Sequence, residues 1–182
     1  MEKDIARVLL SEEQIQNRVR ELGERIAWDY RGRKPVMICI LKGAVMFYTD
    51  LLRAMPIDLS MDFMAVSSYG KRTKSSGEVE IRKDLSISIE NRHVIIVEDI
   101  IDSGFTLTYL SRMLNARGAS SLKICTLLDK PSRRAPGITL KADYSGFEVS
   151  DEFVVGYGLD YDESYRNLPF IGVLKPEIYE NN

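Results

Sequence analysis

The fold is decided by one stretch, Val94-Ile95-Ile96-Val97-Glu98-Asp99-Ile100-Ile101-Asp102-Ser103-Gly104-Phe105-Thr106-Leu107. Its first residues are apolar and β-branched, which predicts a central parallel strand covered on both faces. Two adjacent carboxylates, Glu98 and Asp99, follow this strand, and a short polar loop then leads into a helix. Ligands of doubly wound sheets bind outside the carboxyl ends of the strands, so this loop is the first candidate for a functional site.

Strand and helix patterns alternate outward from this stretch. Ser11 and Gln14 form a capping-box pattern in front of the first helix, and residues 57–65 alternate as in a strand with one covered face. Strands are expected at 36–41, 57–65, 94–97 and 122–128, and helices at 12–30, 44–55 and 106–116. This alternation predicts an α/β fold with a right-handed parallel sheet flanked by helices.

Two regions depart from this pattern. Residues 67–77 are polar, contain two glycines and lack an apolar repeat, which predicts a mobile loop with a strand at 78–82 returning from it. Beyond Pro136 the pattern changes to short strands and turns. We expect residues 142–182 to form a small C-terminal hood over the carboxyl edge of the sheet, with strands at 142–147, 153–157 and 170–174. The 182 residues are too few for two ordinary domains, so a single domain over 1–182 is predicted.

Composition excludes several classes of protein. The chain has 25 Lys and Arg against 27 Asp and Glu, without the basic excess that phosphate neutralisation demands of a nucleic-acid binder. It shows no signal-peptide core and no apolar run near the ~18 residues of a membrane span. Cys39 and Cys125 lie far apart in apolar runs, which favours buried, reduced thiols and a cytoplasmic location. One histidine and two cysteines supply a zinc site poorly.

Other common catalytic and phosphate-binding motifs are absent from the sequence or incomplete. The P-loop pattern is absent, and Gly156-x-Gly158 is followed by Tyr161 where a dinucleotide fingerprint needs its third glycine. A Ser-His-Asp triad would require His93, the single histidine. His93 stands at the start of a predicted strand, away from the edge that binds ligands, so we assign it a structural role.

The residue types in the decisive stretch suit a ribose phosphate. Glu98 and Asp99 can accept hydrogen bonds from neighbouring ribose hydroxyls, directly or through a divalent cation. Ser103 and Thr106 supply hydroxyls beside a helix N-terminus, where backbone N–H groups and the helix dipole attract a phosphate dianion. Gly104 permits close approach of the backbone. A solvated acidic turn is the alternative for a short Asp-Ser-Gly, but the complete run favours the ribose-phosphate site.

The run 94–107 resembles the phosphoribosyl-pyrophosphate-binding signature of the type I phosphoribosyltransferases. Further segments resemble the hypoxanthine-guanine branch of this family and occur in the same order along nearly the whole chain. They are Leu41-Lys42-Gly43-Ala44, Ser67-Ser68-Tyr69-Gly70, Leu128-Asp129-Lys130-Pro131 and the stretch from Phe153 to Arg166.

The resemblance implies a role for each matching position in the decisive stretch. Glu98 and Asp99 would hold the ribose hydroxyls. Asp102 would also face N7 of the purine as general acid and base. The ribose 5′-phosphate would be cradled by Asp102, Ser103, Gly104, Phe105 and Thr106. If Phe105 contributes only its backbone N–H group, the identity of that side chain matters little.

The resemblance assigns the other segments to the leaving group, the base and a lid. Lys42, Gly43 and Arg166 would bind pyrophosphate, and the Leu41–Lys42 peptide bond can be cis. Ser68 and Tyr69 would belong to a loop that closes over the reaction. The purine would be bound by Lys130 at its O6, by stacking on Phe153, by the Val154 backbone, and near Asp160. Magnesium would be held at Glu98 and Asp99, and Asp160 would contact an ion carried by pyrophosphate.

The resemblance implies transfer of a phosphoribosyl group to N9 of hypoxanthine or guanine by a magnesium-dependent homo-oligomer, a dimer or tetramer. Two alternatives remain open. One is a phosphoribosyltransferase for another base, such as xanthine or a pyrimidine. The other is a regulator with this fold that senses phosphoribosyl pyrophosphate and binds nucleic acid. Only about 35 residues precede the first predicted sheet strand, too few for a helix-turn-helix domain, and the sequence pI of 5.6 also disfavours it.

Overall fold

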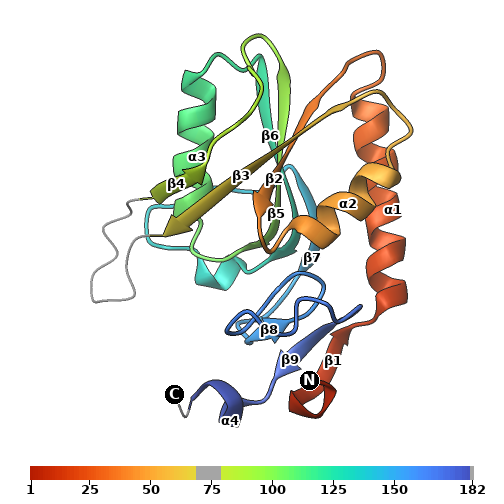
Figure 1. Ribbon diagram of the computed structural model, residues 1–182, viewed down its shortest axis with the longest axis vertical. Coiled ribbons are helices and arrows are strands. Elements are labelled where there is room, and N and C mark those ends of the chain that lie inside the picture. The colour runs from red at the N-terminus through yellow and green to blue at the C-terminus, as the bar shows by residue number, and fades with distance from the viewer. Residues whose placement is uncertain (69–78, 181–182) are drawn as a thin grey trace.

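The computed structural model describes residues 1–68 and 79–180, which form two sheets (Figure 1). Within these residues the large sheet has the strand order β4-β3-β2-β5-β6-β7 and the small sheet the order β1-β9-β8. The strands are β1 Ile5–Leu10, β2 Val36–Leu41, β3 Ser60–Ser68, β4 Val79–Lys83, β5 His93–Ile101, β6 Ser121–Asp129, β7 Tyr144–Glu148, β8 Val154–Val155 and β9 Ile171–Leu174. The helices are α1 Glu12–Asp29, α2 Val45–Arg53, α3 Phe105–Ala116 and α4 Pro176–Tyr179, with 3₁₀ turns at Glu2–Asp4 and Pro131–Arg133.

The large sheet is parallel except for its edge strand β4, which runs antiparallel to β3. Strand β2 pairs with β3 on one side and with β5 on the other. The chain therefore reverses its direction of travel across the sheet between β2 and β5. A crevice opens at such a reversal, outside the carboxyl ends of the two strands. The predicted α/β class is confirmed, and its switch point lies beside the decisive stretch.

The large sheet has a separate apolar core on each face. Met37 and Cys39 of β2 pack with α1 and α2 on one face, and Val36 and Ile38 pack with α3 on the other. Figure 1 shows the same layering, with α1 and α2 on one side of the sheet and α3 on the other. A strand buried on both faces needs an uninterrupted apolar run, which explains residues 36–41.

The first helix begins as its sequence predicts. The Gln14 amide donates to Ser11 Oγ at 3.2 Å, and the Ser11 amide donates to Gln14 Oε1 at 2.9 Å, which completes the capping box. Apolar residues at helical spacing then face the sheet and are buried: Ile15, Val19, Leu22 and Ile26. The cap and the buried stripe together stabilise α1.

The predicted hood requires two corrections. Residues 142–147 were expected in it, but β7 pairs in parallel with β6 at the edge of the large sheet. A parallel neighbour usually follows a crossover helix, and no α-helix lies between β6 and β7, so the sequence pattern was misleading. The small sheet is instead completed by β1 from the N-terminal segment, which pairs antiparallel with β9.

Strand β3 also differs from its prediction. It begins at Ser60, and the buried side chains are Asp62 and Met64, whereas Met61 is 51% exposed. Phe63 packs with the α1–α2 core and Met64 with the α3 core, so both faces of the strand are covered. The expectation of one covered face was wrong because a separate apolar core packs against each face of the sheet at this strand.

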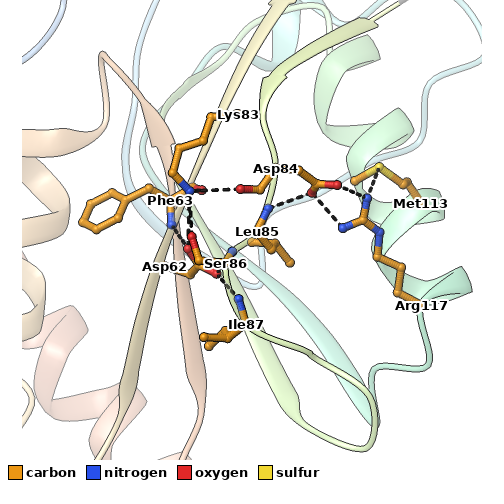
Figure 2. A network of polar contacts seen from close by, with 9 residues as sticks. All are labelled: Asp62, Phe63, Lys83, Asp84, Leu85, Ser86, Ile87, Met113 and Arg117. Carbon is orange, nitrogen blue, oxygen red and sulfur yellow. Dashed lines mark hydrogen bonds and ion pairs between the residues drawn. The ribbon is translucent and has the colours of Figure 1, made fainter.

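The buried Asp62 organises the turn that follows β4 (Figure 2). Its carboxylate accepts hydrogen bonds from the Ser86 amide at 2.7 Å and the Ile87 amide at 3.1 Å. Burial opposes ionisation, but these backbone donors prevail and lower the pKa of Asp62. Arg117 of α3 holds neighbouring Asp84 through two 2.7 Å contacts. The network ties the end of β4 to both β3 and α3.

Three further predictions meet the structure here. The returning strand is present as β4, whereas the predicted loop 67–77 lies, beyond Ser68, outside the described residues, and so does Tyr69. Cys39 and Cys125 are buried and unpaired, as predicted, and burial raises the pKa of Cys39 to about 12. No helix in the described part of the chain is long and apolar enough to cross a membrane.

Candidate active site

Glu98 and Asp99 lie inside β5, where its two neighbours diverge. Pairing of β5 with β2 ends at Val97, while pairing with β6 continues to Ile101. The sequence analysis placed both carboxylates after the strand. They belong to it by hydrogen bonding, because β6 supports the strand along one side only. The open side faces the crevice at the switch point.

The charges of the two carboxylates are only partly compensated, by backbone amides and by the more distant Arg166. Glu98 is buried, and neither residue forms an ion pair within the described chain. Glu98 Oε1 accepts the Asp99 amide at 3.1 Å, and Asp99 Oδ1 accepts the Ile100 amide at 2.8 Å. Burial and the charge of Asp99 raise the pKa of Glu98 well above its usual value, and burial also raises the pKa of Asp99. A ligand that brings hydroxyl donors or a cation would reduce the free-energy cost of keeping the two adjacent, buried carboxylates ionised.

The N-terminus of α3 presents free backbone donors. Gly104 is its N-cap with φ of 82°, and a Cβ there would stand 2.8 Å from Ile138 Cγ2, so both backbone and space favour glycine. No described side chain caps the first amides of this helix. Ser103 and Thr106 line the adjoining cavity of about 180 Å³, as do Glu98 and Asp99. The predicted phosphate-binding groups thus surround one space, while the Phe105 side chain is 38% exposed.

A second cavity of about 360 Å³ adjoins the first. Its lining combines apolar side chains with a few polar groups: Ile100, Asp102, Lys130, Arg133, Asp151, Glu152, Phe153, Val154, Leu159 and Tyr179. We call it the base cavity. Ile100 and Asp102 line both cavities, so the predicted acid and base stands where they meet. Buried Lys130 donates from Nζ to the Glu152 carbonyl at 2.7 Å.

Two arginines after β6 contact the loop that carries Asp102. Arg133 Nε lies 3.2 Å from Asp102 Oδ1, and its guanidinium also reaches Asp151 at 3.4 Å. Arg134 donates to the Asp102 carbonyl at 2.7 Å and pairs with Asp129. The sequence analysis missed both residues. In the sequence they are visible only as an Arg-Arg pair soon after Lys130-Pro131, a pattern typical of an exposed, charged surface. Their contact with the Asp102 loop depends on the pairing of β5 with β6.

The structure brings Lys42 and Arg166 together. Lys42 Nζ contacts Glu163 at 2.7 Å, and Arg166 contacts the same carboxylate at 3.2 Å and Asp160 at 2.9 Å. The Leu41–Lys42 peptide bond is cis, as the resemblance implied. Glu163, absent from the predicted site, is therefore the anion that bridges two cations assigned to pyrophosphate.

Glycines allow the loops around this site to touch. A Cβ on Gly43 would stand 1.7 Å from Asp99 Oδ2, and a Cβ on Gly158 would stand 2.0 Å from the Gly43 carbonyl oxygen. Gly158 also has φ of 104°. The sequence analysis considered Gly158 only as part of a failed dinucleotide motif. Its position shows a packing reason for glycine, which spacing along the sequence could not reveal.

Some predicted residues do not converge on one point. Glu98, Asp99 and Asp160 form no joint cluster, since the described chain holds no group of three His, Cys, Asp or Glu side chains placed to bind a metal. Val154 is buried in β8, and Ser68 ends β3. His93 starts β5, at the end opposite Glu98, and its Nδ1 lies 2.7 Å from Ser121 Oγ, in keeping with its structural role.

Comparison with known proteins agrees with this geometry. The family model for the phosphoribosyl transferase domain matches residues 9–162. The chain is 58% identical to the hypoxanthine-guanine phosphoribosyltransferase of Bacillus subtilis, over 100% of this chain and 99% of that protein. A crystal structure of a hypoxanthine phosphoribosyltransferase from Staphylococcus aureus superposes with a TM-score of 0.94 at 53% identity, covering 98% of this chain and 96% of that one.

A longer relative matches equally well. The chain is 57% identical to the bifunctional protein TilS/HprT of Listeria innocua over 98% of its own length, but it spans only 27% of that protein. An α/β fold with a polar loop and two adjoining cavities at its switch point agrees with the transferases that these relatives are named as. The chain belongs to the phosphoribosyl transferase family.

Proposed function

We propose that this protein transfers the phosphoribosyl group of phosphoribosyl pyrophosphate to N9 of hypoxanthine or guanine, giving IMP or GMP and pyrophosphate. The observation that carries the proposal is the position of Asp102 between two cavities. One cavity holds free helix N–H groups and two unpaired carboxylates, and the other holds Lys130 and Phe153. Relatives of this length carry the same activity in their names.

In the proposed complex the ribose phosphate occupies the smaller cavity. Ser103, Thr106 and the amides that begin α3 bind the 5′-phosphate, because they present several donors to one point. Glu98 and Asp99 accept hydrogen bonds from the ribose hydroxyls, which lowers the cost of their adjacent, buried charges. Phe105 contributes its backbone only, in agreement with its partly exposed side chain.

The base lies in the larger cavity. Lys130 donates to O6 of an oxopurine, Phe153 stacks on the ring, and the Val154 backbone meets its edge. An ammonium group is a donor only, so it pairs with a carbonyl oxygen and opposes the amino group of adenine. Lys130 already donates to the Glu152 carbonyl, which orients its ammonium before the base arrives.

The reaction breaks the bond between the ribose anomeric carbon and pyrophosphate and forms the bond to N9. The electron pair leaves with pyrophosphate, and the proton on N7 of the purine passes to Asp102. Lys42, Arg166 and the Gly43 amide stabilise the charge that develops on the leaving group. When phosphoribosyl pyrophosphate binds, its pyrophosphate group replaces the Glu163 carboxylate as the partner of Lys42 and Arg166. Holding both substrates at the junction of the cavities supplies the orientation that the reaction needs.

The donor set fits magnesium that arrives with the substrate. Mg²⁺ takes one or two carboxylates together with phosphate oxygens and waters, which suits separate sites at Glu98–Asp99 and at Asp160 better than a protein cage of three carboxylates. When bound, the ion would neutralise phosphate charge. Removal of Mg²⁺ with a chelator should abolish turnover, and restoring it should recover the activity.

Steady-state kinetics with phosphoribosyl pyrophosphate and hypoxanthine, guanine, xanthine, adenine or a pyrimidine base tests the proposal. Formation of IMP and GMP, with little or no AMP, is the expected result. Efficient use of xanthine or a pyrimidine in place of hypoxanthine would favour a phosphoribosyltransferase of other specificity. Absence of transfer to every base, with a ligand-dependent shift of DNA or RNA in a gel, would favour the regulator.

The proposal includes a cytoplasmic location, a single domain over 1–182 and a homo-oligomer. The buried, unpaired cysteines support the location, because thiols stay reduced in that compartment. Light scattering after size-exclusion chromatography would distinguish a dimer from a tetramer. Hydrogen exchange at residues 67–77, with and without both substrates, tests whether Ser68 and Tyr69 belong to a closing loop.

A further inference from the structure

A tyrosine near the C-terminus stacks on the aromatic wall of the base cavity. The rings of Tyr179 and Phe153 are 4.8 Å apart between centroids and inclined by 20°. Tyr161 meets Phe153 edge-on, at 5.6 Å and 86°. Phe153 thus has one ring face covered by Tyr179 and a second, nearly perpendicular contact with Tyr161. Offset stacking and edge-to-face contact are the two favourable geometries for aromatic pairs.

The small sheet fixes the position of Tyr179. The Leu174 amide at the end of β9 donates to the Phe153 carbonyl at 2.9 Å, and the next amide, that of Lys175, donates to Asp4 at 3.0 Å. Pro176 then begins α4, whose turn closes through the Glu180 amide and the Pro176 carbonyl at 2.9 Å. The chain therefore leaves β9 beside Phe153 and returns Tyr179 to the same ring.

Tyr179 itself lines the base cavity, together with Ile100, Lys130 and Phe153. Tyr179 covers one face of Phe153, so in the proposed complex the planar base stacks on the other face. A phenylalanine side chain that is 38% exposed would otherwise rotate about its side-chain bonds, and that freedom would be lost on binding. Holding the ring beforehand removes part of this cost.

We propose, on the basis of the function proposed above, that Tyr179 is a positioning residue for the purine. It holds the ring of Phe153 in the stacking orientation and closes the outer side of the base cavity. Its contribution goes to the base and not to phosphoribosyl pyrophosphate, whose ribose phosphate lies in the smaller cavity and whose pyrophosphate lies at Lys42 and Arg166. The ring of Tyr179 carries the effect, so phenylalanine would replace it.

The test compares Tyr179→Ala and Tyr179→Phe with the wild-type enzyme. In Tyr179→Ala we expect the KM for hypoxanthine and guanine to rise about 3- to 10-fold, the range that one aromatic pair supplies. The KM for phosphoribosyl pyrophosphate and kcat should stay within about 2-fold. Tyr179→Phe should restore the KM for the base. Glu180→Ala, an exposed change next to Tyr179, is the matched control and should resemble the wild type.

Three outcomes would overturn the inference. An unchanged KM for the base in Tyr179→Ala would remove Tyr179 from base binding. A lower KM would show that Tyr179 obstructs the cavity. An equal rise of both KM values with a lower Tm would show general damage to the small sheet.

Calorimetric titration with IMP separates this inference from the proposed function. If the wild type binds IMP without catalysing transfer, the proposed function fails, and the affinities of the two Tyr179 variants still decide the role of the ring. If the wild type neither binds IMP nor catalyses transfer, both proposals fall.

Discussion

The smaller cavity, proposed here for the ribose phosphate, and the base cavity, proposed for the purine, differ in their charges before any ligand binds. Glu98 and Asp99 in the first have no ion pair within the described chain, and their pKa values are raised. Around the second, Asp102 pairs with Arg133, and Lys130 donates to a carbonyl. One side of the site is thus held in an unfavourable electrostatic state that a ligand would relieve, while the polar groups of the other side already have partners. Substitutions on the two sides should therefore have different consequences.

Substitution of Asp102, at the junction of the two cavities, should lower turnover more than the other substitutions considered below. Asp102→Asn keeps the shape of the side chain but cannot take a proton, so we expect kcat to fall about 10²- to 10⁴-fold with little change in either KM. Steady-state kinetics with both substrates measures this split. Arg133→Gln serves as the control, because it removes the ion pair while leaving the carboxylate. Near-wild-type turnover of Asp102→Asn would remove Asp102 from the chemistry.

Gly43→Ala should come next, because its new methyl group would occupy the space of Asp99 Oδ2. Displacement of a substrate-positioning carboxylate by about 1 Å can cost about 10² in rate, so kcat/KM for phosphoribosyl pyrophosphate should fall by that order. Gly32→Ala is the control for general destabilisation: its φ of 70° makes alanine strained there, but no atom lies within 4 Å of its Cβ position. Thermal unfolding verifies that both variants fold. Full activity in Gly43→Ala would show that the two loops do not need this close approach.

Lys130→Met tests the base cavity, where Lys130 already has a hydrogen-bond partner before a ligand binds. Methionine keeps the buried length of the side chain but removes the donor, leaving the Glu152 carbonyl and the purine O6 unpaired. Each lost buried partner costs ~1–3 kcal/mol, so kcat/KM for hypoxanthine should fall about 10- to 100-fold. The KM for phosphoribosyl pyrophosphate should change little. Selectivity by Lys130 would be refuted if the wild-type enzyme used adenine as readily as hypoxanthine.

The smallest expected effect is on stability without ligand, where Glu98→Gln should raise the free energy of unfolding. The folded-state pKa of Glu98 is raised, so the folded protein binds more protons than the unfolded chain once the pH exceeds the usual glutamate pKa. The free energy of unfolding therefore falls as the pH rises from the usual glutamate pKa to the raised pKa of the folded protein. Glutamine does not ionise, so Glu98→Gln avoids this loss. Without ligand, we expect Glu98→Gln to raise the free energy of unfolding by about 1 kcal/mol at pH 8, with the difference vanishing near pH 4.

Urea unfolding at the two pH values measures this difference. Glu24→Gln, an exposed change on α1, should show no comparable gain at pH 8. A Glu98→Gln variant that is less stable than the wild type at pH 8 would mean that the buried carboxylate is already compensated in the free protein.

The sequence predicted most of the large sheet and singled out the residues that line the smaller cavity, for a physical reason. The buried strand, the two carboxylates and the glycine before α3 are consecutive, so local periodicity and turn chemistry identify them without knowledge of the fold. The capping box of α1 was equally local. Lys130, Phe153 and Arg166 came from a resemblance, because each alone resembles an ordinary surface or core residue.

The missed features all depend on contacts between distant segments. Glu163, Arg134 and Gly158 acquire their roles only when the loops meet, and no spacing rule connects them. The same holds for β1 and β7, whose partners in the sheets depend on tertiary packing. Asp62 shows the limit within a single strand, since its burial follows from amides some twenty residues later in the chain, at Ser86 and Ile87.

The pairing of β1 with β9 has a consequence for how the protein matures on the ribosome. Almost the whole chain separates the two strands, so their pairing has to wait until the last strand has emerged, and closing so long a loop is slow. The parallel sheet and its phosphate loop can assemble earlier, from strands that are synthesised first. On the function proposed above, a nascent chain would therefore acquire affinity for a phosphorylated sugar before it could select a base.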